Sequence, residues 1–183
     1  MKKTILILFA ILMASTPLFA KKYDSLKTGL TKVLPEGEKI YKTSIKLTQE
    51  QADTLNAVGE ADFWKGDAFT VYYTKKADGS LDTAAVQIME VIEIYQAIHV
   101  WVIGLKADGT RTGLSVRELT DHYSYPLAEE AFTSRFPTRE NQKNGTDPSS
   151  LDSISGATMS CDLLKYSVER VKLVLEMAGL SQT

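Results

Sequence analysis

Alternating apolar and polar positions predict a β-sheet in the middle of the chain. Residues 68–74 are mostly aromatic or β-branched, and strand-like segments follow at 84–94, 97–105 and 112–119. Asp-Gly turn sequences separate these segments at 77–80 and 107–110, and such turns favour hairpins. The order predicts an antiparallel meander. Segment 97–105 is apolar on both faces, so we expect it to be a central strand.

Apolar positions three and four residues apart predict helices before and after these strands in the sequence. The predicted helices span 24–33, 48–58, 127–136 and 159–178, and a weaker strand pattern covers 39–47. Thr48 and Gln51 form a capping-box pattern that starts the second helix. The expected fold class is α+β: an antiparallel sheet meander with flanking helices and a C-terminal helix.

The first 20 residues have the pattern of a secretory signal peptide. Lys2 and Lys3 precede a short apolar run that is too short to span a membrane comfortably. We expect cleavage after Ala20, which leaves one domain, 21–183, outside the cytoplasm in the periplasm or the extracellular space. An uncleaved segment that anchors the protein in the membrane is the alternative.

Charge and composition bear on three possible features: a nucleic-acid partner, a disulfide and a metal site. The formal net charge is −2 and there is no basic run, so nothing favours a nucleic-acid partner. Cys161 is the only cysteine, which excludes an intrachain disulfide, and we expect it to be buried in the last helix. His99 stands in an apolar strand without neighbouring ligands, so we expect it to be a packed or edge-facing residue rather than a metal ligand.

A short motif lies directly before the last predicted helix. Residues 152–158 read DSISGAT, that is, D-x-x-S-G-A-T. Gly156 permits left-handed backbone geometry and Ala157 adds little bulk. The Thr158 hydroxyl then lies at the first turn of a helix, where unpaired N–H groups and a partial positive charge favour a phosphate. An ordinary Ser/Thr-rich helix start with a glycine turn is the competing interpretation.

This segment resembles the flavinylation motif D-x-x-[ST]-G-A-T of the FMN-binding domain family. That family includes the G subunit of Rnf complexes and the C subunit of sodium-pumping NADH:quinone oxidoreductases. The resemblance extends from about residue 69 to the C-terminus. The family's E-S-x-G or E-T-P-G stretch corresponds to residues 123–126, and Tyr123 and Pro126 depart from its Glu and Gly.

The resemblance implies that Thr158 carries FMN covalently, through a phosphoester bond made by a separate flavin transferase that uses FAD. Ser124 is then a candidate hydrogen-bond donor to the flavin, and Tyr125 a candidate for stacking on its ring. The other residues expected around the cofactor are Asp152, Ser155, Gly156, Ala157 and Ser160.

The function implied is that of an exported flavoprotein that transfers electrons outside the cytoplasm. Its donor and acceptor are unspecified, and membrane-associated proteins are among the options. The chain has no dinucleotide fingerprint and no catalytic triad pattern, which favours an electron carrier over a stand-alone enzyme. The alternatives are a flavin-free exported binding or scaffold domain and a flavin-dependent reductase with its own small-molecule acceptor.

Overall fold

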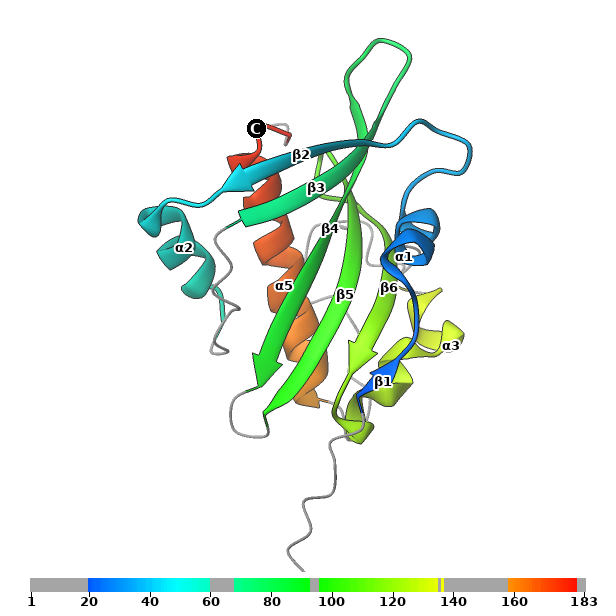
Figure 1. Cartoon of the computed structure of the whole chain (residues 1–183), viewed down its shortest axis with the longest axis vertical. Helices are drawn as coiled ribbons and strands as arrows, with labels where there is room; N and C mark the ends of the chain where they lie inside the picture. Colours follow the sequence, from blue (N-terminus) through cyan, green and yellow to red (C-terminus); the bar gives the residue numbers. More distant parts are fainter. Residues whose placement is uncertain (1–19, 60–67, 93–95, 135, 137–157, 181–183) are drawn as a thin grey trace, which may run out of the picture.

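Six strands form one antiparallel sheet in the order β1-β6-β5-β4-β3-β2 (Figure 1). The computed structural model describes residues 20–59, 68–92, 96–134, 136 and 158–180. The strands are β1 (Lys21–Lys22), β2 (Tyr41–Lys46), β3 (Ala68–Lys75), β4 (Leu81–Ile92), β5 (Ala97–Lys106) and β6 (Arg111–Leu119). Strands β2 to β6 pair consecutively, which confirms the predicted meander.

The Asp-Gly turns are confirmed at both predicted positions. Gly79 and Gly109 have positive φ angles of 85° and 81°, which glycine adopts without steric cost. The Asp78 carboxylate accepts a hydrogen bond from the Ser80 N–H at 2.8 Å, and Asp108 accepts one from Thr110 at 2.9 Å. Strand β1 was not predicted; it is two exposed lysines that extend the sheet beyond β6.

Three of the predicted helices form close to their expected bounds: α1 (Leu26–Val33), α2 (Gln49–Asn56) and α5 (Thr158–Met177). The capping box at the start of α2 is present as expected. The helix predicted at 127–136 is wrong in extent. A 3₁₀ helix, η2 (His122–Ala128), comes first, and α3 spans only Glu130–Thr133. Glu129 is extended between them, so the two pieces cannot join into one helix.

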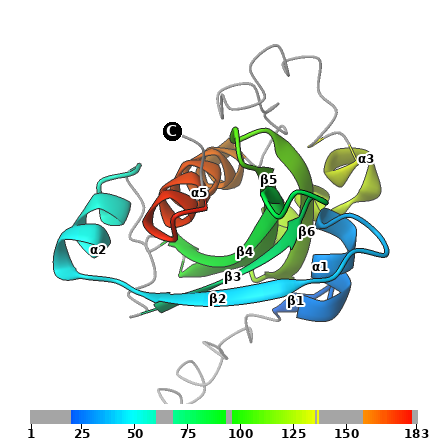
Figure 2. The ribbon, with the colours of Figure 1, turned by 90° about the horizontal axis from the view of Figure 1, so that it is seen from above.

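The sheet is curved, and α5 lies on its concave side while α1 lies against the opposite side (Figure 2). The main apolar cluster joins α5 to the sheet, and its largest fully buried side chain is Trp101 of β5. A smaller cluster joins α1 to the other face through Ala85 and Val102. Strand β5 is therefore covered on both faces, as its sequence predicts. Cys161 is also buried as expected, on α5.

Two glycines let α1 pack closely on the sheet. Gly104 of β5 and Gly113 of β6 are direct cross-strand neighbours. A Cβ at Gly104 would lie 2.8 Å from the Val33 carbonyl oxygen at the end of α1, and one at Gly113 would lie 3.0 Å from the Val33 Cα. Any larger residue would push α1 outward, so this face of the sheet leaves no space for a ligand at that point.

Candidate functional site

Thr158 is the first residue of α5, and its side chain is exposed. Met159 follows it and is 50% exposed. A helix of 20 residues presents unpaired N–H groups and a partial positive charge at this end. An exposed hydroxyl at this point is accessible to a modifying enzyme. Asp152, Ser155, Gly156 and Ala157 lie outside the described residues.

Ser160 points inward, away from the exposed surface. It is 2% exposed, and its Oγ lies 3.1 Å from Nε2 of His99, a fully buried residue of β5. The cofactor contact that the resemblance implies for Ser160 would therefore compete with an existing hydrogen bond within the core. His99 Nδ1 has no hydrogen-bond partner within the described part of the chain.

Burial determines the protonation state of His99. It lowers the pKa of the His99 imidazole to about 4, against weaker opposing effects of Asp121 and the Ala97 backbone. The imidazole is therefore neutral at pH 7. It is packed against the Trp101 ring, with the two ring centroids 5.4 Å apart. The prediction that His99 is a packed residue is confirmed.

A charged pair is buried deeper under the same helix. Arg170 of α5 donates from Nη1 to the Glu90 carboxylate of β4 at 2.5 Å, and both side chains are fully buried. Ser167 donates to the other Glu90 oxygen at 2.8 Å and accepts from the Trp101 indole N–H at 3.0 Å. Burial raises the pKa of the Glu90 carboxyl, while Arg170 and Ser167 oppose that increase.

Arg170 also holds α2 in place. Its Nε donates to the Leu55 carbonyl at 3.0 Å and its Nη2 to the Val58 carbonyl at 2.5 Å. These carbonyls belong to the end of α2 and the turn after it, where helix carbonyls lack intrahelical partners. One guanidinium thus joins α5, β4 and the end of α2.

Cross-strand pairing places the Glu90–Arg170 pair and the His99–Ser160 contact side by side on one face of the sheet. Glu90 and His99 are direct partners in the β4–β5 register, and both face α5. Sequence reasoning predicted a packed His99 but missed Glu90 and Arg170. The available signal was Glu90 between the apolar residues Met89 and Val91, together with His99 in the apolar strand β5. Buried ionisable groups require partners.

Ser124 and Tyr125 lie in η2. Ser124 is buried, and its hydroxyl donates to the Asp121 carbonyl at 2.5 Å. The Tyr125 ring meets the Tyr23 ring edge-on with centroids 6.4 Å apart, and the Lys21 ammonium lies 5.1 Å from the Tyr125 centroid. Both predicted flavin contacts are therefore engaged in packing the N-terminal strand and the 3₁₀ helix.

Tyr123 is the exposed aromatic residue of this segment. Its side chain is 61% exposed, and its ring lies 3.9 Å from the His122 ring, centroid to centroid. Segment η2 follows the end of β6, where Leu119 pairs with His99. Because His99 also contacts Ser160, η2 begins at the same end of the molecule as α5 (Figure 1).

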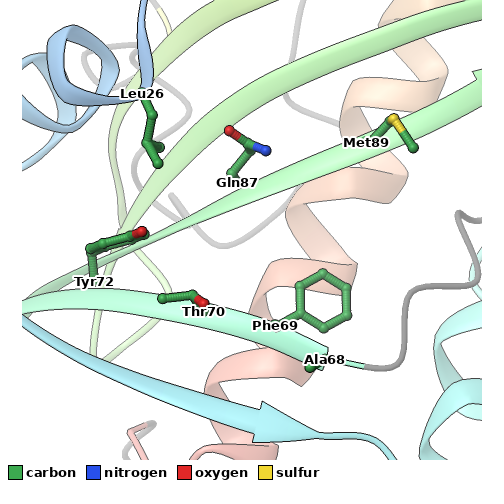
Figure 3. Close-up of a pocket in the computed structure, with 7 residues that line it drawn as sticks. All are labelled: Leu26, Ala68, Phe69, Thr70, Tyr72, Gln87 and Met89. Atoms are coloured by element: carbon green, nitrogen blue, oxygen red, sulfur yellow. The ribbon is translucent and has the colours of Figure 1, made fainter.

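The opposite face of the sheet carries a cavity of about 330 Å³. Figure 3 shows Leu26 of α1 above it, Gln87 and Met89 on β4, and Thr70 and Tyr72 on β3. None of its lining residues belongs to α5. This cavity is therefore separated from Thr158 by the sheet.

Among the described residues, no group of three or more His, Cys, Asp or Glu side chains is placed to hold a metal ion. In the same part of the chain, no helix has the length and apolar character needed to cross a bilayer. Comparisons with protein-family models, curated proteins and solved structures found no significant match for this chain.

Proposed function

We propose that the protein is an exported electron carrier that holds FMN covalently on Thr158. The proposal depends on one observation: the threonine that ends the D-x-x-S-G-A-T motif has an exposed side chain at the start of a 20-residue helix. A phosphate ester fits this position because helix N–H groups and the helix dipole favour an anion there. The identity of the cofactor, FMN, is inferred from the resemblance to the FMN-binding domain family.

On this proposal, flavin attachment transfers the FMN part of FAD to the Thr158 oxygen, and no electrons are exchanged in that step. The Thr158 oxygen attacks the FAD phosphorus on the riboflavin side, and the bond from that phosphorus to the bridging oxygen breaks. AMP leaves, and the hydroxyl proton passes to a base of the transferase or to water. The tethered flavin accepts and releases electrons. The chain's own residues hold the ester and orient it.

The surroundings of Thr158 favour an electron carrier over an enzyme with its own substrate. Tyr123 and Met159 offer exposed apolar surface at this end of the molecule, on which a planar ring can rest. The 330 Å³ cavity lies on the other side of the sheet, so a small substrate bound there would not reach the flavin. The donor and acceptor therefore exchange electrons at an exposed end, and membrane-associated proteins remain among the proposed partners.

The test is to produce the exported chain together with a flavin transferase. We expect a yellow protein whose flavin remains attached after denaturation and whose intact mass has increased by the mass of one FMN less one water. Thr158→Ala should be colourless, and Thr158→Ser, which keeps a hydroxyl, should retain some flavin. A wild-type protein without attached flavin would favour the flavin-free binding or scaffold domain. Turnover of a small acceptor by the yellow protein would favour the reductase.

A further inference from the structure

We propose that His99 and Ser160 are positioning residues that fix the first turn of α5, so that Thr158 presents its hydroxyl in one orientation for flavin attachment. This inference rests on the proposed function, because it concerns the same hydroxyl. The family resemblance places Ser160 near the cofactor, but it gives no role to the buried contact between Ser160 and His99.

The contact between the two residues joins the helix start to the middle of the sheet. The Nε2–Oγ distance is 3.1 Å, the residues are 61 positions apart in the chain, and Ser160 lies within the same first turn as Thr158. Helix ends tend to fray because their first N–H groups lack intrahelical partners. A buried hydrogen bond at this turn opposes fraying where the attacking oxygen must be held still.

His99 is itself held in place from several sides. Its backbone pairs with Glu90 on one side and Leu119 on the other, and its ring lies against Trp101. A neutral imidazole has one N–H and one lone pair, so one of its nitrogens can share a hydrogen bond with the Ser160 hydroxyl. The ring is therefore a fixed point to which the helix start is attached.

Ser167 supplies a matched comparison within the same helix. It is also a buried serine on the inner face of α5, and it also contacts an aromatic nitrogen of β5, at 3.0 Å from the Trp101 indole. It lies in the middle of the helix, outside the first turn that contains Thr158. A structural contribution should be common to both serines, whereas positioning of Thr158 should be specific to Ser160.

Orientation affects rate because the attacking oxygen must align with the bond that breaks at phosphorus. Misplacement of a reacting group by about 1 Å costs up to roughly 100-fold in rate. A frayed first turn of α5 would move Thr158 relative to the transferase and FAD. The fold of the domain would remain intact, because the main apolar cluster holds the rest of the helix.

The experiment measures initial rates of flavin attachment with purified chain, purified flavin transferase and FAD, followed by intact mass. Ser160→Ala and His99→Phe should each lower kcat/KM roughly tenfold. Ser167→Ala should stay within about twofold of wild type, although its thermal midpoint falls at least as far. The double variant should be no slower than either single variant, since the residues act as a pair. His99→Gln, whose amide can reach Ser160, should recover part of the rate.

The outcomes separate this inference from the proposed function. Wild-type chain that accepts no flavin would refute the proposed function and this inference with it. Normal flavin attachment to wild type, with equal rates for Ser160→Ala and Ser167→Ala, would overturn the positioning role alone. If His99→Phe does not fold, Ser160→Ala and His99→Gln decide the matter, because they keep the core volume nearly unchanged.

Discussion

The first turn of α5 and its middle are buried against the same sheet but use different chemistry. At the first turn, an exposed Thr158 is followed by a buried Ser160 that contacts a neutral His99. In the middle, Ser167 and Arg170 surround a buried carboxylate. The middle is a charged structural junction that holds three elements together. The first turn is held by a neutral hydrogen bond and keeps the Thr158 hydroxyl at the surface.

This difference has a thermodynamic consequence. Removing one member of a buried charged pair leaves the other charge without a partner, whereas removing one member of a neutral pair leaves only an unsatisfied dipole. Substitutions in the middle of α5 should therefore lower stability most and affect flavin attachment least. Substitutions at the first turn should show the reverse order.

The largest loss of stability is expected for Arg170→Met, which leaves Glu90 buried without its cation. We expect the free energy of unfolding to fall by about 3–5 kcal/mol, as measured by urea denaturation. The double variant with Glu90→Leu should recover part of that loss, because no charge remains in the core. It should not recover all of it, since the Leu55 and Val58 carbonyls each lose the hydrogen bond from Arg170. A cost below about 1 kcal/mol for Arg170→Met would contradict the assigned junction.

Acidification should reveal the second largest effect, at the first turn. The pKa of His99 is lowered to about 4 in the folded chain, so between pH 6.5 and 4 the unfolded chain binds a proton that the folded chain does not. Stability should therefore fall as pH decreases through this range, by roughly 3 kcal/mol, and should be independent of His99 above it.

His99→Gln isolates this contribution. The raised pKa of Glu90 acts in the opposite direction at acidic pH, because the folded chain then holds that proton more tightly. Only the difference between wild type and His99→Gln, measured across the pH range, reports on His99. Parallel stability curves for the two proteins would show that His99 titrates normally. His122→Gln is the control, because the His122 side chain is 69% exposed.

A smaller effect is expected for Ser167→Ala. The substitution removes a donor to Glu90 and an acceptor for the Trp101 N–H, so we expect a loss of about 1–3 kcal/mol. Thermal denaturation measures it. The double variant Ser167→Ala/Trp101→Phe should lose less stability than the two single variants lose together, because either change alone already removes the hydrogen bond. Strict additivity would argue against the contact.

The smallest change in stability should follow Thr158→Ala, within about 0.5 kcal/mol, since the side chain is exposed. The same substitution should remove all covalent flavin. Calorimetry and intact mass on one sample test both statements. A large loss of stability would mean that Thr158 has a structural role, and the contrast between the two parts of α5 would then fail.

Local patterns were sufficient to predict most of the fold. The Asp-Gly turns, the capping box at Thr48 and the apolar faces of the strands depend on residues close together in the sequence, so the meander and α2 were predicted correctly. The helix at 127–136 failed because Glu129 takes an extended conformation between two short helical pieces. Apolar spacing alone does not reveal such a break.

The candidate site was only partly predictable, because its contacts join distant parts of the chain. The motif pointed to Thr158, and the structure places it at the helix start as expected. The partner of Ser160 is 61 residues away and that of Arg170 is 80 residues away. Helical and strand periodicity carry no information about such pairings. A buried Glu90 shows only that a cation must exist, and not which of 21 Lys and Arg residues supplies it.

The Glu90–Arg170 pair also constrains the order in which the chain folds. Strands β4 and β5 emerge from the ribosome before α5. If the sheet closed at that stage, Glu90 would be buried without its counter-ion. That penalty discourages premature closure of the sheet. The nascent polypeptide should therefore leave this part of the sheet open until its last helix has emerged.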